Sequence, residues 1–259
     1  MIEYVLKITV EEFMFTLPDN IVYKISDLSF IGNTHRYVPK EEKIPIEEAQ
    51  KNRDLIKLAT EAKEIVLCKQ VHGADVYYSK TGTIIGQEPE ADGCFTDGSG
   101  ILLAIQTADC VPVVFFSSDC QVIGAAHAGW KGTKLNILDN LYNKISNIGK
   151  GFSAIIGPSI HQKSYEVDEG FLQNFLNEDK KNERFFIDST QSQHFMFDLP
   201  GYVRSKLEKL DINNIHHVNE DTYTTKLPDG SFRYPSYRRS CHTGEFYPRS
   251  ILTTIMIKK

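Results

Sequence analysis

One cysteine and two histidines are the residues of this chain best suited to chemistry, because each lies at the edge of an apolar, strand-like run. They are His72 in KQVHGADVY, Cys110 in ILLAIQTADCVPVVFF and His127 in QVIGAAHAGWKG. A thiolate and two imidazoles match the ligand preferences of zinc and copper. Three protein ligands are typical of a catalytic zinc site, whose fourth position stays open for water or substrate. If these side chains converge, the sequence predicts a metal-dependent enzyme.

Each of the three residues also has a plainer interpretation. A buried cysteine is usually a small core hydrophobe, and a lone histidine in an apolar context is more often a hydrogen-bonded core residue. Their spacing is wide and irregular, unlike the paired CxxC signature of many structural zinc sites. Spacing alone therefore leaves a metal site and a packing role both open.

A second candidate site is the turn AHAGWKGT, which leads from an expected strand into an expected helix. Backbone N–H groups at such a turn attract anions, and Lys131 would add positive charge. The turn lacks the GxxxxGK[ST] spacing of a nucleotide-binding P-loop. A plain strand–helix connection is the alternative. Trp130 is either a core anchor or a stacking surface for a base.

Arginines and tyrosines gather in the segment SFRYPSYRRSCHTGEFYPR. Adjacent residues of a strand face opposite sides, so a strand here would direct only one of Arg238 and Arg239 into a given site. An arginine in a pocket holds phosphate or carboxylate through two hydrogen bonds. Arg238 is therefore a candidate catalytic residue, and a solvated edge strand is the alternative.

Three carboxylates lie close in sequence to the proposed ligands, namely Asp92, Asp97 and Asp109. Each suits a general acid or base, a partner that orients a histidine ligand, or a turn. Asp97 precedes a glycine, which is typical of a turn. Asp109 directly precedes Cys110, so we favour it for proton transfer or for orienting a ligand.

Composition bounds the class of protein. The chain has 259 residues, of which 41% are hydrophobic and 24% are charged, as in globular proteins with a full core. Its net charge of -5 argues against nucleic acid or an anionic membrane as a partner. No apolar run approaches the roughly 20 residues that cross a bilayer, and no signal peptide is recognisable. Five scattered cysteines without a CxxC pair suit a reducing compartment, so we expect a cytoplasmic protein.

Strand-like and helix-like segments alternate without a linker, which predicts one α/β (α+β) domain over residues 1–259, with a mixed central sheet flanked by helices. Expected strands cover residues 65–68, 74–78, 101–106, 111–116, 122–126 and the closing run SILTTIMI. Expected helices cover residues 41–63, 134–147, 169–176 and 199–210. Pro112 should interrupt ladder pairing and bend the chain just after Cys110.

Five segments resemble, in order, the motifs of the YfiH/laccase-domain (polyphenol oxidase-like) family. They are KQVHGADV, TADCVPVVFF, IGAAHAGWKGT, IGPSIHQKSYEV and SYRRS with the following TG. The resemblance runs from about residue 65 to the C-terminus. It implies a single α/β domain in which zinc is held by His72, Cys110 and His127.

The resemblance also implies an activity, namely zinc-dependent phosphorolysis of purine nucleosides together with deamination of adenosine. The expected partners are adenosine, inosine, guanosine or S-methyl-5'-thioadenosine, and phosphate. Asp109, Lys131 and Arg238 are then the candidate catalytic residues. The sequence leaves the preferred nucleoside and the oligomeric state open.

Two other functions stay open. One is a copper-dependent polyphenol oxidase. Such enzymes need many histidine ligands, including His-x-His pairs, and this chain has 8 histidines without that pattern. The other is a non-catalytic, zinc-stabilised nucleoside-binding protein. A fourth ligand would favour it, and Cys94, Asp92 and His242 are the candidates.

The chain departs from the family pattern in three places. The segment IVYKISDLSFIGNTHRYVPK lacks the usual Thr-Arg pair, with Lys24, His35 or Arg36 as possible substitutes. Asp221-Thr222 stands where Cys-Thr is usual. Glu245 follows Thr243-Gly244 where an arginine is usual, and Arg249 lies nearby. These changes bear on the recognition of phosphate or ribose and leave the three metal ligands intact.

Overall fold

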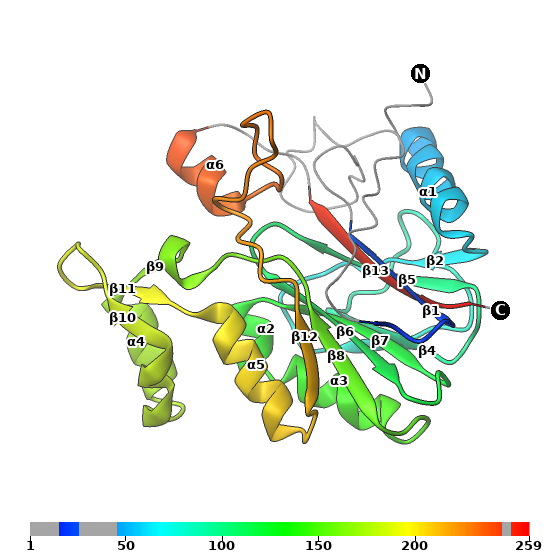
Figure 1. Cartoon of the computed structure of the whole chain (residues 1–259), viewed down its shortest axis with the longest axis horizontal. Coiled ribbons are helices and arrows are strands. Elements are labelled where there is room, and N and C mark those ends of the chain that lie inside the picture. The colour runs from blue at the N-terminus through cyan, green and yellow to red at the C-terminus, as the bar shows by residue number, and fades with distance from the viewer. Residues whose placement is uncertain (1–15, 26–45, 245–249, 259) are drawn as a thin grey trace.

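The computed structural model describes residues 16–25, 46–244 and 250–258, which form an α/β fold with two large sheets (Figure 1). Its strands are β1 (Ile21–Ile25), β2 (Glu64–Val66), β3 (Val76–Tyr78), β4 (Gly93–Thr96), β5 (Ile101–Thr107), β6 (Val111–Ser117), β7 (Ile123–Ala128), β8 (Phe152–Ile156), β9 (Glu166–Asp168), β10 (Phe186–Asp188), β11 (His194–Phe197), β12 (Asn214–His217) and β13 (Ile251–Ile257). Its helices are α1 (Ile46–Thr60), α2 (Trp130–Lys134), α3 (Ile137–Ile145), α4 (Glu169–Leu176), α5 (Leu199–Lys209) and α6 (Tyr237–Thr243), with 3-10 turns η2 (Gln162–Ser164) and η3 (Lys180–Phe185).

The strands form three sheets with mixed pairing. The largest is six-stranded in the order β12-β8-β6-β7-β4-β3, and the next is four-stranded in the order β1-β13-β5-β2. A small sheet of β10, β11 and β9 lies with α4 to one side of the molecule (Figure 1). The pairing of β12 with β8 is parallel, whereas β6 and β7 pair antiparallel. The mixed α/β class predicted from the sequence is confirmed, although two large sheets replace one central sheet.

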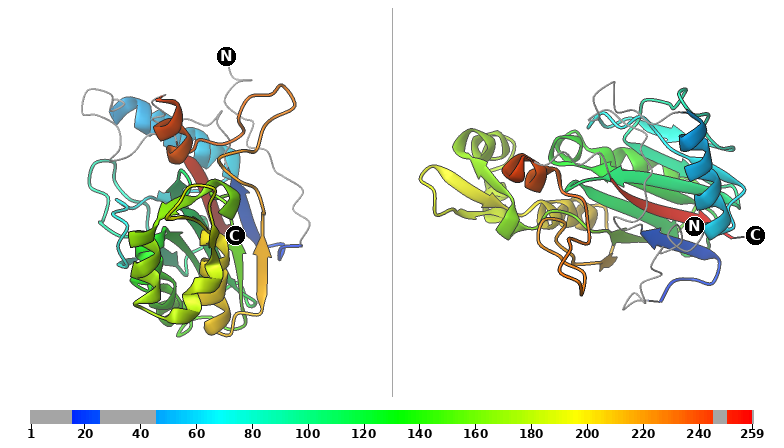
Figure 2. Two further views of the ribbon diagram at one scale, coloured as in Figure 1. Left: turned by 90° about the vertical axis from the view of Figure 1, so that its left-hand side faces the viewer. Right: turned by 90° about the horizontal axis from the view of Figure 1, so that it is seen from above.

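The two large sheets pack face to face, and helices cover their outer faces. Side chains of β5 alternate, so that Leu103 and Ile105 enter the core shared with the other sheet, while Leu102 and Ala104 lie in the cluster that includes Ile56 of α1. Contacts of α3 with β7 and of α5 with β6 and β8 cover the six-stranded sheet, as two further views make clear (Figure 2). The near-continuous apolar character of β5 and β6 is thus explained by burial on both faces.

Several expected elements appear with small changes in their bounds. α4 covers the expected residues, and α5 and β13 agree within one residue. The helix expected over residues 134–147 corresponds to α3 and begins later, at Ile137, because Asn136 adopts a left-handed conformation with φ of 64° between α2 and α3. Across the described part of the chain, no helix combines the length and apolar character needed to cross a bilayer.

Two local expectations were wrong, and both concern the site. The segment carrying Arg238 and Arg239 is the helix α6 rather than a strand, and the Ser236 side chain caps it by accepting from the Arg239 N–H. Pro112 does not break the ladder but lies in β6 opposite His127. The bend precedes it at residues 108–110, where Asp109 has a φ of 89°.

The packing of α3 on β7 gives a test of the core. Leu141 is fully buried over Gly124, so Leu141→Ala removes buried methyl groups and leaves a cavity. We expect the free energy of unfolding, measured by urea denaturation, to fall by about 3 kcal/mol. Leu135→Ala is the control, because Leu135 is 50% exposed and should change the same quantity by less than about 0.5 kcal/mol. Equal losses in the two variants would contradict this packing.

Candidate metal centre

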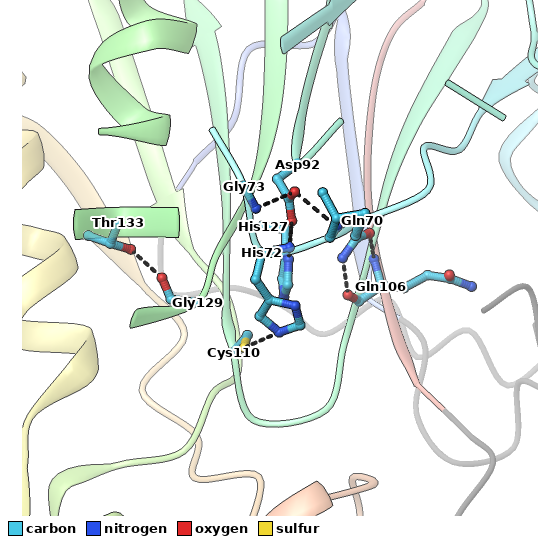
Figure 3. A network of polar contacts seen from close by, with 10 residues as sticks. Gln70, His72, Gly73, Asp92, Gln106, Cys110, His127, Gly129 and Thr133 are labelled. Atoms are coloured by element: carbon cyan, nitrogen blue, oxygen red, sulfur yellow. Dashed lines mark hydrogen bonds and ion pairs between the residues drawn. The ribbon is translucent and has the colours of Figure 1, made fainter. Parts of the chain in front are cut away.

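The three predicted ligands converge, although they come from distant segments. His72 lies between β2 and β3, Cys110 lies just before β6, and His127 lies on β7 (Figure 3). One ligand atom from each lies within 4.8 Å of the others, and the Cys110 Sγ is 3.8 Å from the His72 Nε2. The imidazole centroids are 4.7 Å apart with planes at 73°. Among the described residues this is the group of histidine, cysteine and carboxylate side chains able to surround a metal ion.

The buried carboxylate of Asp92 positions both histidines. Its Oδ1 accepts from the His72 N–H at 2.9 Å and from the His127 Nδ1 at 2.8 Å, and its Oδ2 accepts from the N–H groups of Val71 and Gly73 at 3.0 and 2.7 Å (Figure 3). Three successive N–H groups surround the carboxylate because His72 has a φ of 59°. With Nδ1 of His127 bound to Asp92, its Nε2 is left for a metal.

The charges within this group reinforce one another. Burial would raise the pKa of the Cys110 thiol, but the charge and hydrogen bonds of His127 and His72 outweigh burial and lower it to about 6. Burial would lower the pKa of His127, but the Cys110 thiolate and Asp92 raise it to about 9. Cys110 is therefore a thiolate at neutral pH, the form that binds metals, and metal binding would displace a proton from His127.

The geometry fits a small tetrahedral ion. With metal–ligand bonds of about 2.0–2.3 Å, ligand atoms of a tetrahedral zinc site lie about 3.5 Å apart. The Cys110 Sγ and the His72 Nε2 are 3.8 Å apart, close to that value. Gly129 permits the turn after β7 to close on the ligands, because a Cβ there would lie 2.9 Å from the Cys110 Sγ and 3.2 Å from the His72 Cδ2. One sulfur and two nitrogens suit zinc or copper and leave one tetrahedral position open.

The three candidates for a fourth ligand contact other residues instead. Asp92 is turned toward Nδ1 of His127, on the side away from its Nε2. Cys94 is buried beside Cys68. His242 is exposed and its Nδ1 is 2.9 Å from the Tyr223 hydroxyl. Within the part of the chain described here, none of these three joins the ligand group.

Asp109 lies beside the ligand group but faces α6. Its carboxylate accepts from the Thr222 hydroxyl and from the Arg238 N–H, both at 2.7 Å. Burial raises its pKa, although those hydrogen bonds, one from Ser236 and the charge of Arg239 oppose the rise. The backbone of Asp109 also accepts from the Ile160 N–H at 2.9 Å. Asp109 thus connects the bend before β6 to α6.

The two adjacent arginines have different surroundings, as expected, although a helix rather than a strand separates them. Arg239 is buried and donates to the carbonyls of Thr222, Tyr223 and Tyr234. Arg238 donates from Nη1 to the Glu166 carbonyl at 2.7 Å, and its guanidinium lies 5.1 Å from the ring centroid of Tyr165. Arg239 is therefore structural, whereas Arg238 is linked through its backbone N–H to Asp109, the residue before Cys110.

The glycine turn after β7 leads into a short helix, and its two candidate site residues, Trp130 and Lys131, lie in different surroundings. α2 has five residues, and Lys131 on it is exposed. Trp130 is half-buried, with its ring centroid 5.0 Å from that of Phe171, so it packs on the aromatic core. Of the substitutes considered for the usual Thr-Arg pair, Lys24 donates to the Ala59 carbonyl at 2.6 Å, whereas His35 and Arg36 lie outside the described residues. Glu245 and Arg249, which concern the separate departure after Gly244, also lie outside them.

Comparisons with known proteins identify the family of the chain. Residues 45–253 match the family model "Multi-copper polyphenol oxidoreductase laccase". A Rickettsia conorii protein named purine nucleoside phosphorylase is 42% identical over 92% of this chain and 97% of its own length. The protein YfiH of Escherichia coli, also named purine nucleoside phosphorylase, is 29% identical over 69% of this chain and 70% of its own length.

Solved structures share the fold. The hypothetical protein YfiH of Bacillus licheniformis superposes with a TM-score of 0.76 at 21% identity, covering 92% of this chain and 93% of that chain. The protein NMB0706 of Neisseria meningitidis superposes with a TM-score of 0.73 at 22% identity, covering 93% of this chain and 96% of that chain. The fold described above is therefore found in both of these proteins across nearly their whole lengths.

The role of Asp92 can be tested by removing its charge. We expect Asp92→Asn to lower the affinity for zinc about 10–100-fold, measured by competition with a chelator, because the acceptor that orients His127 is weakened. Asp97→Asn is the control, since Asp97 is exposed and accepts from the Tyr78 hydroxyl. Affinities of wild type and Asp92→Asn that agree within error would contradict the role.

The pKa of Cys110 gives a second test on metal-free protein. Only the thiolate reacts with iodoacetamide, so the rate at Cys110 should rise with pH to half its maximum near pH 6 and then level off. Peptide mapping by mass spectrometry would follow the modified residue, and zinc should slow the reaction. A midpoint near the ordinary cysteine pKa of about 8.5 would contradict the electrostatic arrangement.

Proposed function

Because the chain belongs to the laccase family described as multi-copper polyphenol oxidoreductases, we propose that it is a metal enzyme of that family, acting as a zinc-dependent purine nucleoside phosphorylase with adenosine deaminase activity. The observation that carries the proposal is the three-ligand group of His72, Cys110 and His127, whose fourth position no described side chain fills. The names of the relatives from Rickettsia conorii and Escherichia coli support the choice of reaction. We place the reaction in the cytoplasm, where the five free cysteines would persist.

The proposed main reaction exchanges one bond at the ribose. A phosphate oxygen forms the bond to C1' while the bond from C1' to the purine nitrogen breaks, and the electron pair leaves with the purine, which takes up a proton. In deamination, water adds to C6 of adenosine and ammonia leaves to give inosine. A cation held by the three ligands would supply Lewis-acid chemistry and activate water.

The chain's own residues divide the remaining tasks. Arg238 would bind phosphate, because among the described residues its guanidinium donates only to the Glu166 carbonyl and keeps further N–H donors for an anion. Lys131 would add positive charge from the turn after β7. We assign Asp109 to positioning rather than to proton transfer, since both of its oxygens accept hydrogen bonds that tie it to Thr222 and α6.

A copper-dependent phenol oxidase is less compatible with the donor set, despite the description of the family. A multicopper oxidase holds a trinuclear cluster with many histidines, often in His-x-His pairs. The 8 histidines of this sequence include no such pair. Within the described residues, the single ligand group contains only two histidines. One metal per chain is therefore the expected stoichiometry.

Chromatography of adenosine incubated with the zinc-loaded protein tests the proposal. Adenine should appear only when phosphate is present, together with ribose 1-phosphate, and a slower release of inosine should be independent of phosphate. Cys110→Ala should reduce bound zinc and both products to background, because the variant loses the thiolate ligand. Cys120→Ala, which changes a half-buried cysteine in a turn, is the control. Full zinc and activity in Cys110→Ala, or no turnover by zinc-loaded wild type, would overturn the assignment.

A further inference from the structure

Tyr165, which follows η2 and precedes β9, has an aromatic ring held from several sides. The ring centroids of Phe171 and Phe197 lie 6.1 and 5.7 Å from its own. The Arg238 guanidinium carbon lies 5.1 Å from the same centroid. The backbone is fixed too, because the Tyr165 carbonyl accepts from the Phe197 N–H at 2.9 Å. The position of the phenol ring is therefore set by the fold.

Tyr165 belongs to the segment that packs beside the metal ligands. Ile160, five residues earlier, donates to the Asp109 carbonyl, and Arg238 donates its N–H to the Asp109 carboxylate. Since Cys110 directly follows Asp109, these contacts tie the Tyr165–Arg238 pair to the ligand group.

The hydroxyl of Tyr165 is a hydrogen-bond donor without an acceptor among the residues that the structure describes. The side chain is only half-buried. Burial raises its pKa, the charges of Cys110 and Asp109 raise it further, and Arg238 opposes them. The phenol therefore stays protonated at neutral pH and can donate but not act as a base.

We propose that the Tyr165 hydroxyl and the Arg238 guanidinium together form the site for an oxyanion, inorganic phosphate, beside the His72–Cys110–His127 group. Arg238 supplies the charge, and its stacking on Tyr165 together with its bond to the Glu166 carbonyl holds it in place. The Tyr165 hydroxyl adds a neutral donor next to the Arg238 guanidinium, so one tetrahedral anion can accept hydrogen bonds from both side chains. This inference rests on the proposed function for the identity of the anion and makes Tyr165 a further catalytic residue of that reaction.

The test compares two phenylalanine variants of the zinc-loaded protein. Tyr165→Phe keeps the ring and its stacking but removes the hydroxyl. We expect the KM for phosphate to rise about 10-fold, as for loss of one hydrogen bond to a charged group, while the KM for inosine, the zinc content and the melting temperature stay unchanged. Tyr142→Phe is the matched control, because this half-buried tyrosine of α3 packs on Phe152 with centroids 5.5 Å apart.

Direct binding separates this inference from the proposed function. Calorimetric titration of zinc-loaded wild type and Tyr165→Phe with inorganic phosphate measures the anion site without turnover. Weaker phosphate binding by Tyr165→Phe alone would support the inference even if no nucleoside were cleaved. Phosphorolysis with an unchanged KM and affinity for phosphate in Tyr165→Phe, or an equal effect of Tyr142→Phe, would overturn the inference and leave the proposed function standing.

Discussion

The buried carboxylate of Asp92 is the group on which the rest of the site depends. A carboxylate without exposure to water is costly unless hydrogen bonds satisfy it, and here three successive backbone N–H groups and the His127 imidazole do so. His127 donates from β7 and the N–H groups come from the loop before β3. The Asp92 carboxylate therefore joins two segments that local structure alone would leave independent. The αL conformation of His72 is sustained by the same bonds.

A second buried carboxylate, that of Asp109, performs a comparable task beside the ligand group. Asp109 occupies the bend that delivers Cys110, and it holds α6 through the Arg238 N–H. Asp92 thus orients the two histidines, and Asp109 holds α6, which carries Arg238 next to Tyr165. The two sheets provide much of the rigid frame, because Cys110 lies between the ends of β5 and β6 and His127 lies near the end of β7, and all three strands are buried along their length. His72 lies in the loop between β2 and β3, where its N–H donates to Asp92.

Residue chemistry and apolar patterning were sufficient to predict the mixed α/β class, most strands and α4, and to single out the three candidate ligands, whose assignment to zinc came from the family resemblance. They were insufficient where long-range hydrogen bonds decide the outcome. Asp109 seemed the better partner for the ligands because it adjoins Cys110, yet Asp92, one of the three candidate carboxylates, orients them. The segment with Arg238 resembles an edge strand locally, but a Ser236 cap and the Asp109 carboxylate make it a helix. Tyr165 lies in the family-like segment IGPSIHQKSYEV, but nothing in that segment singled it out, since its proposed role depends on its contact with Arg238, which lies far away in sequence.

The most direct test of the central claim is zinc K-edge X-ray absorption on protein loaded with one equivalent of zinc. The arrangement around Asp92 predicts a first shell with one sulfur at about 2.3 Å, two imidazole nitrogens at about 2.0–2.1 Å and one further light atom in the open position. A shell without sulfur, or one with four protein ligands, would contradict a three-ligand centre built from His72, Cys110 and His127.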